Sequence, residues 1–332
     1  MSVEPTPKRY VVTGCAGFIG ACVSRKLLAA GHQVVGFDDL NSAYDPRMKA
    51  WRLAALRRSS AFHFHQLDIT DRHLVADFFR AGSAHPFDAV FHLAARAGVR
   101  ASVDDPAAYL ETNVTGTLHV LDACRLHRVP KLVLASTSAV YGSDTPSPFR
   151  EDSQASRPLS PYAASKKAAE ALAYSYHALY GLDVSVLRYF TVYGPAGRPD
   201  MSIFRFVRQI AEGDTLVVYG DGSQRRDFTY VEDIARGTIA AAKPLGYEVM
   251  NLGGDHSTAL SELIRLIAEH LGQEARIDYR PAHAADVLHS SADIRRADEL
   301  LDWRPTVSLE EGIAATIDWY RQNRELATQI SL

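Results

Sequence analysis

Short apolar runs alternate with helical patterns along the chain as far as Tyr189. The runs predict strands, and they lie at residues 10–12, 33–37, 61–66, 89–93, 131–135 and 184–189. Between the runs, apolar residues recur at helical spacing, as Ile19 and Val23 do, and longer helices are predicted at residues 104–128 and 162–180. Strands that alternate with helices predict an α/β fold built on a doubly wound parallel sheet.

Three glycines separate the first strand from its helix. Gly14 lets the backbone turn, Gly17 lets a pyrophosphate approach the main chain, and Gly20 lets the helix pack against its strand. The N–H groups at the helix start, together with the helix dipole, then face the phosphates. The spacing is G-x-x-G-x-x-G, and a tight strand-to-helix turn needs glycine in any case. The pattern alone therefore does not identify a nucleotide site.

Acidic residues follow the second and third strands. Asp38 lies close to the offset of about 20 residues at which an acid binds the adenosine ribose. A carboxylate there repels a 2′-phosphate, which favours NAD over NADP, and Asp39 beside it is expected to be solvated. Asp68 can reach the adenine amine while Ile69 packs on the ring. Ligands of such sheets bind beyond the carboxyl ends of the strands. The candidates at those ends are Gly14, Asp38, Asp68, Ala94, Ser136 and Tyr189.

Beyond Tyr189 the pattern changes, because Gly194, Pro195 and Gly197 break regular structure. A helix at 230–242 and a strand at 248–252 are expected to return to the first domain. The fold class is thus a Rossmann-type doubly wound parallel sheet with a smaller, interleaved C-terminal substrate-binding lobe. The expected Rossmann domain covers residues 1–189 plus about 229–252, and the lobe covers about 190–228 and 253–332.

Composition narrows the class of protein. The chain has 332 residues, 47% of them hydrophobic, which suffices for one large core or two joined lobes. The net charge is −3 without a basic run, so neither nucleic acid nor a membrane surface is expected as a partner. No signal peptide or membrane span is expected. Three cysteines without a C-x-x-C spacing favour a reducing, cytoplasmic location. His63 and His65 are interpreted as exterior strand positions, so no metal site is predicted.

Tyr162 and Lys166 form Tyr-x-x-x-Lys on one helix face. A free tyrosine has a pKa of about 10, and lowering this value by about three units means stabilising the phenolate by about 4 kcal/mol. The lysine ammonium is expected to supply part of this, and the positive nicotinamide of NAD more. Thr137 can hydrogen-bond the substrate oxygen that Tyr162 deprotonates. The pair alone is equally compatible with a surface Tyr–Lys stack, but together with the glycine turn it indicates catalysis.

These motifs carry a resemblance over nearly the whole chain. Thr13-Gly14-x-x-Gly17-x-x-Gly20, Asp38, Ser136-Thr137-Ser138 and Tyr162-x-x-x-Lys166 resemble the extended short-chain dehydrogenase/reductase family. Further stretches resemble its nucleotide-sugar 4-epimerases: residues 92–95, 136–142, 188–195 and 226–228. Residues 97–100 and 197–201 resemble the UDP-glucuronate 4-epimerase subgroup.

The resemblance implies a cycle without net oxidation. Tyr162 takes the proton of the sugar 4-hydroxyl, hydride passes from C4 to tightly held NAD, the 4-keto sugar turns over, and hydride returns to its other face. UDP-glucuronate is thereby converted to UDP-galacturonate. The catalytic residues so implied are Tyr162, Lys166 and Thr137. The implied cofactor contacts are Gly14, Gly17, Phe18, Ile19, Gly20, Asp38, Asp68, Ile69, Leu93, Ala94, Ala95, Ser136, Tyr162, Lys166 and Tyr189.

Ala139 separates sister reactions. Relatives that dehydrate carry Asp-Glu where this chain has Ser138-Ala139, and relatives that decarboxylate UDP-glucuronate carry Glu at the position of Ala139. Ala139 cannot supply an acid, which favours a reaction that stops at epimerisation.

Sugar specificity is expected at Thr191 and Arg198. A threonine hydroxyl and an arginine fork can hold a uronate carboxylate. Holding it away from alignment with the ketone would also suppress loss of CO2 from the 4-keto intermediate. The alternative for Arg198 is a loop arginine paired with Asp200.

The nucleotide end rests on resemblance alone. Phe204, Val218 and Tyr219 resemble the uracil pocket, Arg226 the diphosphate contact, and Asp286 an acid near the uridine ribose. Ala285 and His283 depart from the usual residues there. Arg100 and Ser138 complete the substrate candidates, Arg100 having a surface role as its alternative.

Other functions stay open at this point. The first is a UDP-glucose or UDP-N-acetylhexosamine 4-epimerase, the next a UDP-glucuronate decarboxylase, and the most distant a non-catalytic NAD-binding regulator. The family resemblance also implies a homodimer.

Overall fold

The computed structural model describes residues 6–82, 85–282 and 287–332. Within them, seven strands form one sheet in the order β11-β6-β5-β4-β1-β2-β3, and all neighbours are parallel. The strands are β1 (Arg9–Thr13), β2 (Gln33–Asp38), β3 (Phe62–Gln66), β4 (Ala89–His92), β5 (Lys131–Thr137), β6 (Asp183–Tyr189) and β11 (Tyr247–Leu252). The predicted doubly wound sheet is confirmed, including the return of the chain at β11.

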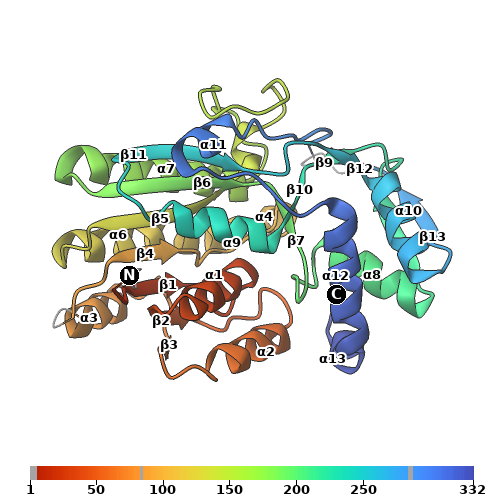
Figure 1. Ribbon diagram of the computed structural model, residues 1–332. Coiled ribbons are helices and arrows are strands. Elements are labelled where there is room, and N and C mark those ends of the chain that lie inside the picture. Colours follow the sequence, from red (N-terminus) through yellow and green to blue (C-terminus); the bar gives the residue numbers. More distant parts are fainter. Residues whose placement is uncertain (1–5, 83–84, 283–286) are drawn as a thin grey trace, which may run out of the picture.

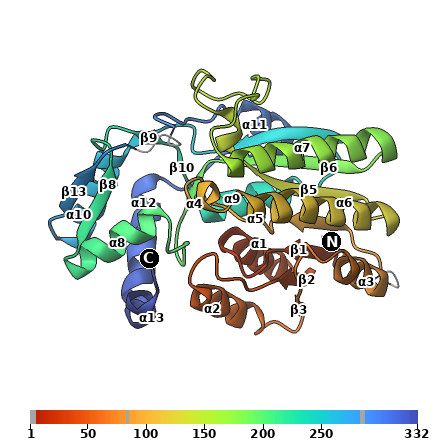
Figure 2. The same cartoon turned by 180° about the vertical axis from the view of Figure 1, so that it is seen from behind.

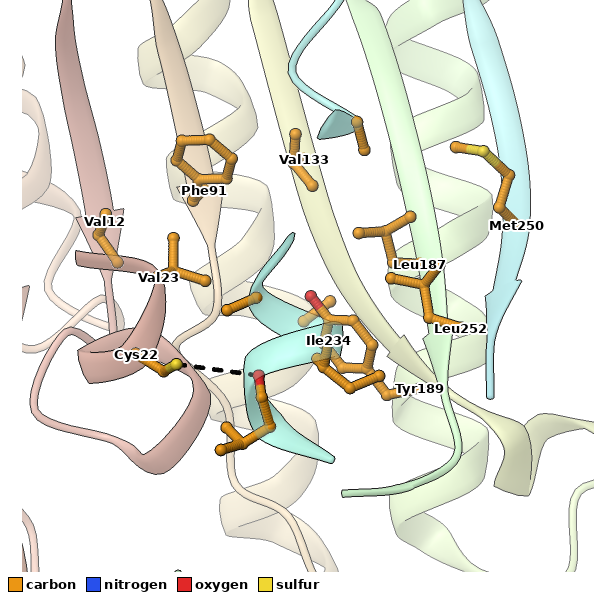
Figure 3. Packing of buried hydrophobic residues seen from close by; sticks show 14 of the residues in the cluster. Val12, Cys22, Val23, Phe91, Val133, Leu187, Tyr189, Ile234, Met250 and Leu252 are labelled. Atoms are coloured by element: carbon orange, nitrogen blue, oxygen red, sulfur yellow. Dashed lines mark hydrogen bonds between the residues drawn. The ribbon is translucent and has the colours of Figure 1, made fainter. Parts of the chain in front are cut away.

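Helices cover both faces of this sheet. In Figure 1, α1 and α9 lie over one face, and Figure 2 shows α6 and α7 over the other. The helices packed on the sheet or on each other here are α1 (Phe18–Ala29), α2 (Pro46–Leu56), α3 (Arg72–Gly82), α4 (Ala101–Asp104), α5 (Pro106–Leu110), α6 (Thr117–Leu126), α7 (Pro161–Tyr180), α9 (Val231–Ala240) and α11 (Arg295–Leu301). Figure 3 shows Val23 of α1 and Ile234 of α9 packed against Val12, Val133 and Leu187 of the sheet.

The remaining elements, which we call the second lobe, lie to one side of the sheet (Figure 1). They are α8 (Ser202–Glu212), α10 (Leu260–Leu271), α12 (Leu309–Gln322) and α13 (Arg324–Gln329), with the strand pairs β7 (Thr191–Tyr193) and β10 (Phe228–Tyr230), β8 (Thr215–Tyr219) and β13 (Arg276–Arg280), and β9 (Arg225–Arg226) and β12 (Thr258–Ala259). Met48 of α2 is buried in the core of this lobe, and Trp51 of α2 meets Trp319 edge-on. Helix α2 is thus shared by both parts.

The chain crosses between the two parts once more near its end. Helix α11 packs against β11 and α9, and Ala297, Leu301 and Trp303 are buried in the same core as the sheet. Apolar side chains far along the sequence therefore complete the core of the first domain.

The helix predicted at residues 104–128 is not continuous. Asp105 caps α5, and a π-helical segment, η1 (Glu111–Gly116), joins α5 to α6. The side chain of Asn113 in this segment accepts from the N–H of Arg96 at 2.8 Å and donates to its carbonyl at 2.9 Å. These bonds tie the segment to the loop after β4.

Two expected absences can be compared with the described part of the chain. None of its helices combines the length and apolar character needed to cross a bilayer. Nor does it contain a group of three or more His, Cys, Asp or Glu placed to hold a metal, and His63 and His65 are exposed.

Candidate active site

A cavity of about 700 Å³ lies at the carboxyl ends of the strands, between the sheet and the second lobe. Every cofactor candidate and every catalytic candidate lines it. The substrate candidates that line it are Arg100, Thr137, Ser138, Thr191, Arg198, Val218, Tyr219 and Arg226. Residues from six strand ends and two lobes thus meet around one space, while their individual roles stay predictions.

The backbone of the glycine turn packs this closely against its neighbours only because Gly14 and Gly20 have no side chains. Gly14 has φ +68°, and a Cβ on it would lie 2.7 Å from the backbone nitrogen of Ala94. A Cβ on Gly20 would lie 2.1 Å from the carbonyl oxygen of Gly14. Among the described residues no side chain caps the first turn of α1, and Phe18, Ile19 and Gly20 of that turn line the cavity. The turn therefore fits the pyrophosphate of NAD.

Asp38 has more partners than the sequence suggested. Its carboxylate accepts from the N–H of Ala16 at 3.2 Å, the N–H of Leu40 at 2.9 Å and Nζ of Lys49 at 3.1 Å. Burial raises the pKa of Asp38, and the charge of Lys49 opposes this. Asp38 therefore closes the glycine turn as well as lining the cavity.

Asp39 was expected to be solvated, and its side chain is partly exposed, at 28%, but it also has partners within the protein. Its carboxylate accepts from the side chain of Asn41 at 2.6 Å and from Lys49 at 3.5 Å. Lys49 itself was not predicted as a site residue. The signal was present, because Lys49 falls among the buried positions of α2 rather than on its polar face.

The catalytic candidates are positioned by two local signals. β5 ends at Thr137, and α7 begins after Ser160, whose Oγ accepts from the N–H of Ala163 at 3.2 Å while Pro161 occupies the first turn. This start places Tyr162 and Lys166 on the face of α7 that lines the cavity.

The protein's own groups raise the pKa of the Tyr162 phenol, and the lowering expected with bound NAD stays a prediction. Burial raises the pKa of the Tyr162 phenol, whereas a hydrogen bond with Thr137 and the charge of Arg198 lower it. Burial lowers the pKa of Lys166 to about 8, and the carboxylate of Glu170 acts in the opposite direction. The protein's own groups thus leave the phenol protonated, and a further positive charge beside it is needed.

Glu170 organises the layer beneath these groups and was not predicted. It is buried one helical turn beyond Lys166. Its Oε1 accepts from Oγ of Ser136 at 2.6 Å, and Arg188 donates to both oxygens at 2.9 and 2.8 Å. The Ser136 hydroxyl is therefore engaged with Glu170, which joins β5, β6 and α7 behind the cavity wall.

On the substrate side, two arginines are already held by protein groups. Arg198 pairs with Asp200, as its alternative interpretation predicted, and Nη2 also donates to the carbonyl of Ala97 at 3.0 Å. It nevertheless lines the cavity close enough to Tyr162 to lower the pKa of that phenol. Arg100 lies over the ring of Tyr219, with Cζ 4.1 Å from the centroid, and so spans the cavity from the first domain to β8.

Two residues predicted for the nucleotide end, Phe204 and Asp286, are not among the described residues that line the cavity. Phe204 does not line the cavity, because it lies on the inner face of α8, buried in the core of the second lobe near Trp319. Its neighbours Arg205 and Phe206 line the cavity instead. Asp286 lies outside the described residues. Ala139 does line the cavity, so no acid is present at that position of the wall.

A doubly wound sheet with a glycine turn and a Tyr-x-x-x-Lys pair in one cavity defines an NAD-dependent enzyme of the extended short-chain dehydrogenase/reductase class. Residues 10–253 match the sequence model of the NAD dependent epimerase/dehydratase family. The chain belongs to this family.

Within this family, the chain is similar to individual UDP-sugar 4-epimerases. The chain is 52% identical over 324 residues to the UDP-glucuronate 4-epimerase of Thermodesulfobacterium geofontis, covering 97% of this chain and 99% of the relative. It is similar to the crystal structure of UDP-glucuronic acid 4-epimerase from Bacillus cereus in complex with UDP-glucuronic acid and NAD, with a TM-score of 0.89, 35% identity, and coverage of 95% and 99%. The UDP-glucose 4-epimerase of Thermotoga maritima with UDP-glucose follows at TM-score 0.87 and 33% identity, with the same coverage.

Proposed function

We propose that this chain is an NAD-dependent epimerase that interconverts UDP-glucuronate and UDP-galacturonate at C4. The observation that carries the proposal is the meeting of Tyr162, Thr137 and Arg198 in one cavity, where the Arg198 charge acts on the phenol. A base for the 4-hydroxyl and a guanidinium for a nearby carboxylate are the two groups that a uronate epimerase needs. The relatives from T. geofontis and B. cereus support the same substrate.

The chemistry of the chain's own residues follows from their placement. Tyr162 removes the proton of the sugar 4-hydroxyl, and the Thr137 hydroxyl hydrogen-bonds the same oxygen. Lys166, buried on the next turn of α7, holds the nicotinamide ribose from that side. NAD, when bound at the glycine turn, supplies the hydride acceptor and the positive charge that lowers the Tyr162 pKa. After the 4-keto sugar has turned over in the cavity, Tyr162 returns its proton and ends the cycle unchanged.

Two features favour epimerisation over loss of CO2. Ala139 offers no acid for a later step. Arg198 and Thr191 are proposed to hold the carboxylate of the 4-keto uronate out of alignment with its ketone, which slows decarboxylation. One observation favours a second candidate, a UDP-glucose 4-epimerase, because Asp200 already neutralises Arg198 in the sugar region.

A product assay tests the proposal. Purified protein is incubated with UDP-glucuronate and, separately, with UDP-glucose, in each case without added NAD. UDP-galacturonate from the first incubation supports the proposal. UDP-galactose from the second alone would assign the neutral-hexose reaction, UDP-xylose would assign decarboxylation, and no turnover of either sugar contradicts the proposal.

We further propose a homodimer and the domain division given above, except that residues 295–303 pack in the core of the first domain. Large apolar side chains are exposed on α6 and α7, among them Leu126 and Leu179, the latter 71% exposed. Pairing of these helices with a second copy would cover them. Light scattering should give twice the chain mass, and replacing Leu179 with Glu should favour the monomer; a monomeric parent protein contradicts the proposal.

A reducing cytoplasm stays a prediction, supported by the three buried thiols.

A further inference from the structure

Arg52 of α2 is a buried cation, and the described residues give it no acidic partner. It is 3% exposed, and no carboxylate of the described residues lies within ion-pair distance of it. Its guanidinium instead donates to uncharged oxygens. Nη1 donates to the carbonyl of Ala16 at 3.3 Å and to Oη of Tyr44 at 2.8 Å, Nε and Nη2 donate to the carbonyl of Ala196 at 3.1 and 2.7 Å, and Nη2 donates to that of Gly197 at 3.0 Å.

These acceptors belong to two segments that lie beside the cavity on different sides of it. Ala16 lies within the glycine turn, between Gly14 and Gly17. Ala196 and Gly197 immediately precede Arg198 in the loop of the second lobe. One side chain thus bonds the cofactor turn to the loop that carries the proposed uronate contact.

The loop of residues 196–198 has a strained backbone that these hydrogen bonds from Arg52 stabilise. Ala196 has φ +54°, a left-handed conformation that a residue with a Cβ adopts only when its surroundings impose it. Both bonds to the Ala196 carbonyl come from Arg52. A Cβ on Gly197 would lie 4.0 Å from Cζ of Phe18, the first residue of α1, so the loop also lies against the glycine turn.

The charge of Arg52 calls for an anion. Five bonds satisfy the five N–H donors of the guanidinium, but they leave its charge uncompensated, and a buried charge without a counter-charge is costly. Lys49, one helical turn earlier on α2, shows the contrast, because Asp38 lies 3.1 Å from its ammonium. The turn beside Arg52 is built to receive a pyrophosphate, which carries the missing negative charge.

We propose that Arg52 is a positioning residue that couples retention of the dinucleotide to the placement of Arg198. Its charge strengthens anion binding at the glycine turn, and its hydrogen bonds transmit the position of that turn to the 196–198 loop. The part of this inference that concerns the uronate rests on the proposed function, whereas the part that concerns NAD does not.

The test compares Arg52→Met and Arg52→Lys with the matched control Arg57→Met. Arg57 is an exposed arginine at the end of the same helix and outside the cavity, so its replacement removes the same charge. NAD released from acid-denatured protein is counted per chain before and after dialysis, and the Kd for added NAD is measured. Arg52→Met is expected to weaken NAD binding at least tenfold, Arg52→Lys less, and Arg57→Met less than twofold.

Kinetics with saturating NAD separate the effect of the Arg52 charge from the effect of the hydrogen bonds that its guanidinium makes to two segments. Both Arg52 variants should raise KM for UDP-glucuronate at least fivefold, with kcat changed less, because lysine cannot bond both segments at once. An unchanged NAD affinity in Arg52→Met, accompanied by a lower Tm, would reduce Arg52 to a structural residue and overturn the proposal. If Arg52→Met does not fold, NAD affinity of Arg52→Lys equal to the parent overturns it as well. If the parent lacks UDP-glucuronate turnover, the proposed function fails while the NAD measurement still decides the role of Arg52.

Discussion

Arg198 and Asp200 form a two-pronged ion pair in the wall of the cavity, with Nε 3.1 Å from Oδ1 and Nη2 2.6 Å from Oδ2. The Arg198 side chain is 18% exposed and that of Asp200 37%. The protein thus places its own carboxylate on the guanidinium that the proposed function assigns to the substrate. A uronate must compete with Asp200, and the more exposed Asp200 is the partner that can turn towards solvent.

Replacing Arg198 with Ala should impair the uronate reaction selectively. Hydrogen bonds to charged groups contribute about 1.5–3 kcal/mol each, so we expect KM for UDP-glucuronate to rise about 10- to 100-fold. Release of CO2 from the 4-keto intermediate should also increase. Steady-state kinetics and product analysis measure both, and unchanged UDP-glucuronate turnover would remove Arg198 from substrate recognition.

Replacing Asp200 with Asn should have the opposite effect. A partly exposed ion pair is worth about 0.5–1 kcal/mol, so freeing Arg198 should lower KM for UDP-glucuronate about two- to fivefold. The matched control is Asp152→Asn, because Asp152 pairs with Arg150 in the same two-pronged way at an exposed site outside the cavity. A higher KM in Asp200→Asn would show that Asp200 supports Arg198 rather than competing with the substrate.

Replacing Tyr162 with Phe tests the base. General-base catalysis contributes about 10²- to 10⁴-fold, and kcat should fall by that factor while co-purified NAD is unchanged. Tyr174→Phe is the control, since Tyr174 lies 56% exposed on the same helix. Full activity of Tyr162→Phe would contradict the proposed role of Tyr162 as the base, although the fold assignment would still hold.

Replacing Glu170 with Gln should shift the alkaline limb of the pH–rate profile to lower pH. The pKa of Lys166 is about 8, lowered by burial and held up by the charge of Glu170. Lys166 carries its ammonium form below that pKa, so activity should fall as the pH rises through it. In Glu170→Gln the Lys166 pKa is lower, so the same fall in activity should occur at lower pH. The exposed Glu269→Gln serves as the control.

Stability complicates the Glu170 experiment. Glu170→Gln leaves buried Arg188 without its carboxylate, a change that costs about 3–5 kcal/mol. The double variant Glu170→Gln/Arg188→Met removes both charges and should keep the shifted limb. A limb that stays in place in a folded variant would contradict the electrostatic role of Glu170.

The sequence alone was sufficient wherever the determining contacts are local. These contacts act within a few residues: the strand periods, the three glycines, Ser160 with Pro161, and the four-residue spacing of Tyr162 and Lys166. They predicted the sheet and two groups of residues that line its cavity, the glycine turn and the Tyr162/Lys166 pair. The resemblance added Arg198 and the nucleotide end. Phe204 shows the limit, because a rotation of one position around α8 exchanges a core residue for a cavity residue.

Tertiary structure decided which charged and polar groups meet. Asp38 with Lys49, Glu170 with Arg188, and Arg52 with Ala16 and Ala196 are partners from different elements, and no local pattern pairs them. The Tyr162 pKa likewise depends on burial, which the whole fold sets. Electrostatic and desolvation energies depend on distance through space, whereas a sequence records distance along the chain.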